Sequence, residues 1–126
     1  MPRGLRFGLS DPNPIAARSG ATLAFVSAQM FQLQSLWFDP ALHADLTVYG
    51  LRIDRMECFA GFGMRGLPLA LFERHAPEFC FAPRLVQSNQ IVRLSLLNHS
   101  AAPVALLHHD NPLCPERIWL EGMQLE

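Results

Sequence analysis

Residues 91–107 read Ile91-Val92-Arg93-Leu94-Ser95-Leu96-Leu97-Asn98-His99-Ser100-Ala101-Ala102-Pro103-Val104-Ala105-Leu106-Leu107. In the first part, Val92, Leu94 and Leu96 occupy every second position, which is how the buried face of a β-strand appears in a sequence. Residues 98–103 are turn-forming types, and apolar residues return from Val104 to His109. We therefore predict a hairpin whose strands, 91–97 and 104–109, are joined by a loop at 98–103.

The same pattern of short apolar segments recurs about every ten residues along the chain, with Pro, Gly, Asn or Asp between nearly all of them. Each segment is too short for an ordinary helix. The pattern predicts an all-β, antiparallel, jelly-roll-like sandwich of about eight strands. The segments are 31–38, 46–53, 67–72, 91–97, 104–107 and 118–125.

Residues 21–38 fit two structures. A helix would gather five apolar residues on one stripe, namely Leu23, Val26, Met30, Leu33 and Trp37. Strands would explain the alternation of Phe31 and Leu33 with a one-residue slip at Gln34-Ser35, as a β-bulge produces. Because the segment is rich in β-favouring types, we favour two strands over the helix.

The first twenty residues differ from the rest, because Pro and Gly punctuate them throughout. We predict that residues 1–20 form an extended N-terminal arm outside the core, and that residues 21–126 form a single β-sandwich domain. The arm carries Arg3, Arg6 and Arg18, and Phe7 or Leu9 could anchor it on a neighbouring subunit.

Composition excludes several classes of function. All ten basic residues of the 126 are arginine, so there is no lysine for a Schiff base, a pyridoxal cofactor or a P-loop. A net charge of −1 does not suit a nonspecific nucleic-acid binder. Three cysteines without metal-ligand spacing indicate buried free thiols in a reducing compartment. Residues 1–10 lack the apolar stretch of a signal peptide and no apolar run suits a membrane span, so we expect synthesis in the cytoplasm and no transmembrane segment.

Two motifs resemble ligand sites. Residues 61–66 have the form G-x-G-x-x-G, but neither a helix nor an acidic residue follows, so we interpret them as a contact loop carrying Phe62, Met64 and Arg65. His108, His109 and Asp110 could ligate a metal as in a small cupin-like enzyme. Adjacent residues of a strand point to opposite faces, so we expect no metal there and keep the metal enzyme as the alternative.

The aromatic residues favour core filling, and we expect Trp37 and Trp119 in the core. Two other roles remain open for these tryptophans: anchors at a protein interface, or the platform of a carbohydrate-binding module. Asn98-His99-Ser100 has the form of a glycosylation sequon, but here it indicates a turn.

Five segments resemble the strands of small β-sandwich capsid or capsid-associated proteins of bacteriophages. They are Ala28–Gln32, Leu36–Phe38, Leu46–Ile53, Leu67–Phe72 and Ile91–Ser100. The first twenty residues and residues 111–115 have no counterpart in that family.

The resemblance implies a non-enzymatic structural protein of the virion, such as a minor capsid, cement or capsid-associated protein. It implies contacts with itself or with a major capsid protein, no cofactor, no small-molecule substrate and no catalytic residue. The interface candidates that the chain offers are Arg3, Arg6, Phe7, Arg18, Phe62, Met64, Arg65 and His99.

Overall fold

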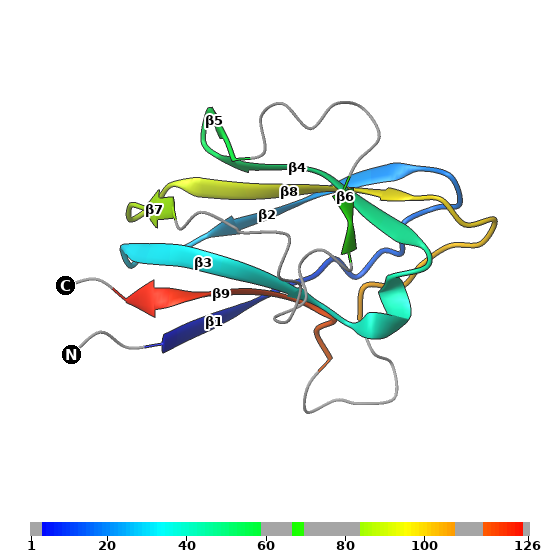
Figure 1. Ribbon diagram of the computed structural model, residues 1–126, viewed down its shortest axis with the longest axis horizontal. Coiled ribbons are helices and arrows are strands. Elements are labelled where there is room, and N and C mark those ends of the chain that lie inside the picture. The colour runs from blue at the N-terminus through cyan, green and yellow to red at the C-terminus, as the bar shows by residue number, and fades with distance from the viewer. Residues whose placement is uncertain (1–3, 59–66, 70–83, 108–114, 125–126) are drawn as a thin grey trace.

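Two antiparallel β-sheets pack face to face in the computed structural model, which describes residues 4–58, 67–69, 84–107 and 115–124 (Figure 1). The described residues form nine strands and one 3-10 turn, η1 (Pro40–Leu42). The strands are β1 (Gly4–Leu9), β2 (Gly20–Val26), β3 (Phe31–Phe38), β4 (Leu46–Ile53), β5 (Met56–Glu57), β6 (Leu67–Pro68), β7 (Arg84–Val86), β8 (Ile91–Asn98) and β9 (Ile118–Gln124). The predicted all-β antiparallel sandwich is confirmed, and the jelly-roll likeness stays a prediction.

The four-stranded sheet has the order β1-β9-β3-β7. The five-stranded sheet has the order β2-β8-β4-β5, with β6 also paired to β4. In Figure 1, β4, β8 and β2 form one layer and β3, β9 and β1 the other. Among the described residues, no helix is long and apolar enough to cross a membrane.

The core lies between the two sheets and is built from one face of each strand. In β8 the buried residues Val92, Leu94 and Leu96 alternate with partly exposed ones, as the sequence predicts. Strand β3 contributes Phe31, Leu33, Leu36 and Phe38 to the same core. Burial of these side chains is the main source of stability, at about 25 cal/mol per Å² of apolar surface.

Residues 21–38 form two strands, β2 and β3, so the helical alternative is wrong. The predicted slip is present as a register shift between Leu33 and Ser35, where β3 pairs with β9. Gly122 lies opposite Leu33 in this pair, and a Cβ atom there would overlap the carbonyl oxygen of Gln32. The bulge therefore requires glycine at position 122.

The predicted hairpin of residues 91–109 is wrong. Strand β8 pairs with β2 on one side and β4 on the other, so both of its edges are occupied. Val104 instead forms a bridge with Ile15, and Leu107 forms one with Glu116. Alternation shows which face of a strand is buried but not which strand lies beside it, so it does not distinguish pairing with the next segment from pairing with a distant one.

The N-terminal segment is extended, but the expectation that it lies outside the core is corrected by the structure. Strand β1 pairs with β9 over six residues and forms one edge of the four-stranded sheet. Leu9 and Ile15 are buried in the core. The reason is that the backbone of this segment hydrogen-bonds to the edge of β9. Its alternating apolar side chains, Leu5, Phe7 and Leu9, then face the core.

Candidate interaction site

The outer face of the four-stranded sheet carries a cluster of one arginine and two tryptophans, which we call the Arg6–Trp cluster (Arg6, Trp37 and Trp119). Trp37 on β3 lies directly opposite Trp119 on β9 in the strand register. The guanidinium carbon of Arg6 lies 4.4 Å from the ring centroid of Trp119 and 5.5 Å from that of Trp37. Both distances suit a cation–π interaction.

Strand alternation places these side chains outside the core. Leu36 and Phe38 flank Trp37 in sequence and are buried, so Trp37 must point to the other face. Ile118 and Leu120 flank Trp119 and are buried, so Trp119 also points to the outer face. Both tryptophans are half-buried, and the expectation that they fill the core is therefore wrong. The sequence does contain a signal for this outward position, because each tryptophan has a core-forming apolar residue on both sides.

The interface candidates of the N-terminal segment have separate environments. Arg6 belongs to the Arg6–Trp cluster. Phe7 points inward, with its ring 4.6 Å from that of Phe25 and 5.1 Å from that of Phe31. Leu9 is buried in the chain's own core, so neither apolar residue anchors a neighbouring subunit. Arg18 has a φ of 54° and donates its backbone N–H to the carbonyl of Ser100.

The remaining predicted residues do not join the Arg6–Trp cluster in the described structure. The ring of His99 shares a hydrogen bond of 2.7 Å with the hydroxyl of Thr47, on the five-stranded sheet. Four interface candidates, Arg3, Phe62, Met64 and Arg65, lie outside the described residues. The metal candidates His108, His109 and Asp110 also lie outside them. Within the described ranges there is no group of three or more potential metal ligands.

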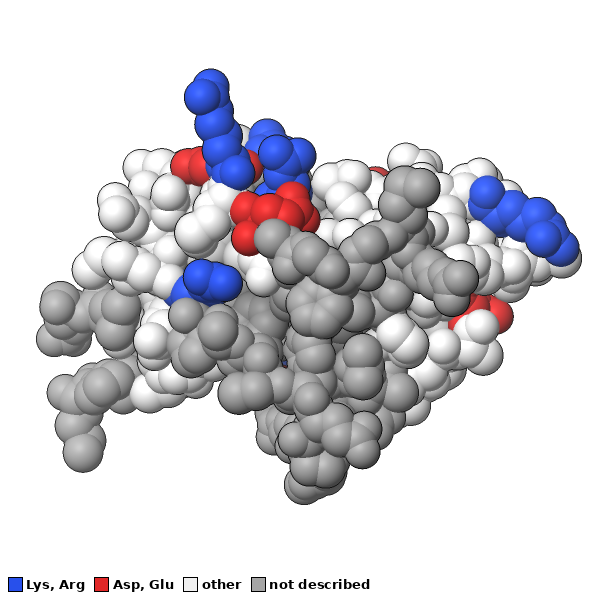
Figure 2. Space-filling model, turned by 45° about the horizontal axis from the view of Figure 1, so that its top comes forward, with Lys and Arg blue, Asp and Glu red and all other residues white. Residues whose placement is uncertain are grey.

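The outer face of the five-stranded sheet has a different character. A shallow hollow of about 420 Å³ is lined by Thr22, Tyr49, Ser95 and neighbouring residues. The hydroxyls of Thr22 and Ser95 share a hydrogen bond of 3.2 Å on this face. Figure 2 shows basic and acidic side chains side by side in its upper left part, which agrees with the 3.4 Å ion pair between Arg52 and Glu57.

One ionisable group has a shifted proton affinity. Burial raises the pKa of the Cys58 thiol above its usual value, and the nearby charge of Arg84 offsets part of that rise. The thiol is therefore protonated at neutral pH, and the thiolate is the nucleophilic form. This arrangement does not prepare Cys58 for nucleophilic catalysis.

No protein-family model matches the chain, and no curated protein and no solved structure is found to be similar to it.

Proposed function

We propose that this chain is a non-enzymatic structural protein that acts through protein–protein contacts, and that the Arg6–Trp cluster is its contact surface. The observation that carries the proposal is the position of two half-buried tryptophans and one arginine on the outer face of a sheet. Tryptophan and arginine are the residues most enriched where binding energy is concentrated in protein interfaces. The outer face of an antiparallel sheet is otherwise the polar one.

The cluster is held in place before any partner arrives. Its three residues belong to three adjacent strands, β1, β9 and β3, so the backbone positions are set by the sheet. Contact with the two rings restricts the guanidinium of Arg6. A rigid surface loses little conformational entropy on binding. It suits a partner that offers an apolar patch with a carboxylate beside it.

The virion is the setting that the resemblance to phage sandwich proteins supports. The segments that carry the resemblance fall on strands β3, β4, β6 and β8. Under this proposal, the partner is a major capsid protein or a second copy of the chain. Repeated contacts in a shell require that every copy present the same surface patch to its partner.

The first experiment asks whether the chain belongs to a particle. Phage particles from the source strain are purified by density gradient, and their proteins are quantified by mass spectrometry. We expect the chain at a fixed ratio to the major shell protein. Its absence from purified particles, when it is present in the lysate, would contradict the virion proposal.

The second experiment tests the surface. Particles are assembled with wild-type protein, with Trp119→Ala and with Tyr49→Ala, which removes an exposed aromatic from the other sheet. We expect incorporation to fall at least about tenfold for Trp119→Ala, the ratio that corresponds to 1.4 kcal/mol of lost binding energy. Tyr49→Ala should be incorporated normally. Equal incorporation of all three folded proteins would exclude the Arg6–Trp cluster as the contact.

A carbohydrate platform would use the same tryptophans in another way. A sugar stacks on an open ring face, whereas Arg6 already lies over Trp119 at 4.4 Å. We therefore expect no change of tryptophan fluorescence on titration with glycans. A saturable change would favour the carbohydrate-binding alternative.

A further inference from the structure

Strand β2 differs from the other edge strands of the described sandwich. Proteins protect the edges of sheets by making edge strands short, by charging them or by covering them. Strand β7 has three residues, β5 has two, and β1 carries Arg6 in its middle. Strand β2 has seven residues, with the sequence Gly-Ala-Thr-Leu-Ala-Phe-Val, and contains neither a charge nor a proline.

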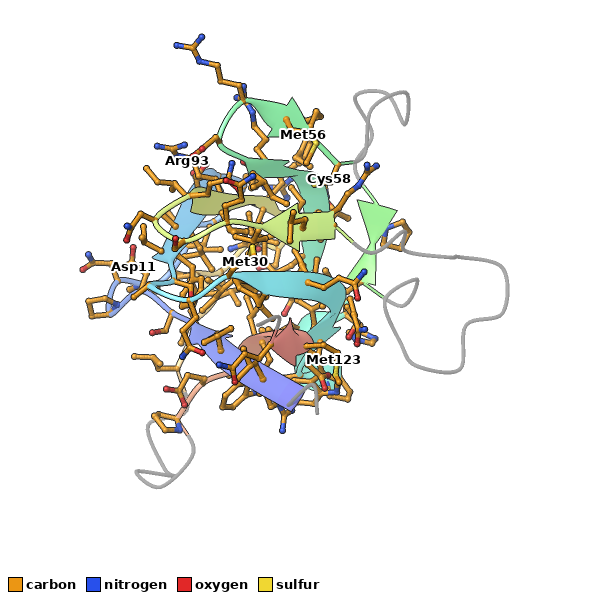
Figure 3. All side chains as sticks on the ribbon, turned by 90° about the vertical axis from the view of Figure 1, so that its left-hand side faces the viewer. Asp11, Met30, Met56, Cys58, Arg93 and Met123 are labelled. Atoms are coloured by element: carbon orange, nitrogen blue, oxygen red, sulfur yellow. The ribbon has the colours of Figure 1, made fainter. Side chains whose placement is uncertain are left out.

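The edge of β2 is also regular. All seven residues pair with β8 in one continuous register without a bulge. In an antiparallel ladder, alternate residues turn their N–H and C=O groups away from the partner strand. Among the described residues, residues 20–26 form backbone hydrogen bonds with β8 alone. Figure 3 shows β2, in light blue, at the left-hand margin of the five-stranded sheet.

The side chains beside this edge are small or apolar. Thr22 and Ala24 are exposed, and Val26 is 53% exposed. Such an edge offers main-chain hydrogen bonds and apolar contact, and β2 itself contributes no charged side chain to the contact.

We propose that β2 pairs antiparallel with β2 of a second copy, which joins two five-stranded sheets into one continuous sheet across a two-fold axis. Two identical strands in this arrangement use the same surface on both subunits. Because β2 is neutral, the pairing brings no like charges together. Seven residues span about 23 Å, at roughly 3.3 Å per residue, which gives the pair several main-chain hydrogen bonds.

The variant Ala24→Glu tests this pairing without harming the monomer. Ala24 lies opposite Arg93 on β8, and Arg93 forms no ion pair with any residue that the structure describes. A glutamate there faces a positive charge within its own chain, so the monomer should remain folded. In the dimer, two new carboxylates would enter one strand pair.

The matched control is Met56→Glu. It introduces the same charge at β5, on the opposite edge of the same sheet, where Met56 is exposed. Figure 3 shows Met56 and Met30 at the end of the sandwich that faces the viewer, so this control also tests an apolar contact at that end.

The measurement is sedimentation equilibrium over a concentration series, with thermal unfolding to verify that each variant is folded. We expect the mass of the wild type to rise from 14.1 kDa toward twice that value. Ala24→Glu should raise the dissociation constant about tenfold or more, and Met56→Glu should leave it unchanged.

Hydrogen exchange gives a second readout. Backbone amides of β2 should become more protected as the protein concentration rises, while those of β1 should not. A wild type that stays at 14.1 kDa at every concentration would overturn the proposal. Dissociation by Met56→Glu but not by Ala24→Glu would also overturn it. These results are independent of the Arg6–Trp cluster, which lies on the other sheet, so either proposal can fail alone.

Discussion

Arg117 and Asp39 join the end of one strand to the beginning of another. The Nε–H of Arg117 donates to Oδ2 of Asp39 at 2.9 Å, and the two side chains are only 16% and 14% exposed. The backbone N–H of Asp39 donates to the carbonyl of Arg117 at 2.8 Å. The Nη1 group of Arg117 also donates to the carbonyl of Ala105 at 2.8 Å. One arginine therefore connects the end of β3 and the segment around Ala105 to the start of β9.

We expect Arg117→Ala to lower the free energy of unfolding by about 2–4 kcal/mol, because it removes the cation that pairs with the largely buried carboxylate of Asp39 and the donor to the carbonyl of Ala105. Urea unfolding measures the change. The matched control is Arg52→Ala, whose partner Glu57 is at 3.4 Å and whose ion pair is exposed, 53% and 41%. That variant should change stability by less than about 1 kcal/mol. Equal losses in the two variants would contradict this account.

Asn98 is fully buried and holds the loop after β8. Its Nδ2 group donates to the carbonyls of Ile15, Ala16 and Ala102, and its Oδ1 atom accepts from the backbone N–H and the hydroxyl of Ser100. We expect Asn98→Asp to cost about 3 kcal/mol or more, because a carboxylate would face carbonyl oxygens.

Thermal unfolding with Ser100→Ala as the milder control, at about 1 kcal/mol, tests the role of Asn98. The amide nitrogen that glycosylation would modify is already used inside the folded chain. The motif at residues 98–100 therefore serves the structure, in agreement with its interpretation as a turn. A stable Asn98→Asp protein would show that these bonds contribute little.

Gly122→Ala should destabilise the protein by about 1–3 kcal/mol, because its Cβ would overlap the carbonyl oxygen of Gln32 at the β3 bulge and the backbone must shift. Gly4→Ala is the matched control, since Gly4 is also a strand glycine but nothing lies within 4 Å of the added atom. Guanidinium unfolding should show a loss for position 122 and almost none for position 4. The reverse order would exclude the close approach as the reason for Gly122.

Arg6→Ala should uncover the two tryptophan rings. We expect the fluorescence emission to shift to longer wavelength as water reaches them, and the free energy of unfolding to fall by about 0.5–1 kcal/mol. Arg55→Ala, an exposed arginine in the turn between β4 and β5, should change neither quantity. An unchanged emission spectrum in Arg6→Ala would show that the guanidinium does not cover the rings.

Cys58 should react slowly with alkylating reagents at pH 8, because burial raises the pKa of its thiol and little thiolate is present. The test uses a Cys80→Ser, Cys114→Ser background and compares the rate with that of a free cysteine peptide. The folded state disfavours the thiolate. The contribution of Cys58 to the free energy of unfolding is therefore fully present below the pKa of the unfolded thiol, and it is lost as the pH rises through the folded pKa. A rate at pH 8 equal to that of the peptide would contradict this assignment.

Much of the fold was predictable from local pattern. The alternation in residues 91–97 places Val92, Leu94 and Leu96 inside, and the slip at Gln34-Ser35 predicts the bulge of β3. Which strands lie side by side was less predictable, because several apolar segments could hydrogen-bond to the same strand edge. The Pro and Gly residues that punctuate positions 1–20 indicate an arm, whereas β1 in fact pairs with β9 from the far end of the chain.

The candidate site was predictable only in part. The sequence indicates Arg6 as an interface candidate and leaves open an anchoring role for Trp119, but nothing in the order of residues places the two 4.4 Å apart. The amino-acid sequence alone determined the strand character, the inner faces and the absence of lysine chemistry, since these depend on residue types and their nearest neighbours. Only the tertiary structure decided that β8 is central, that β2 forms one edge of the sheet in the described part of the chain and that Arg6 covers Trp119. Those features depend on which distant strands pair, and pairing is settled by the packing of the whole chain.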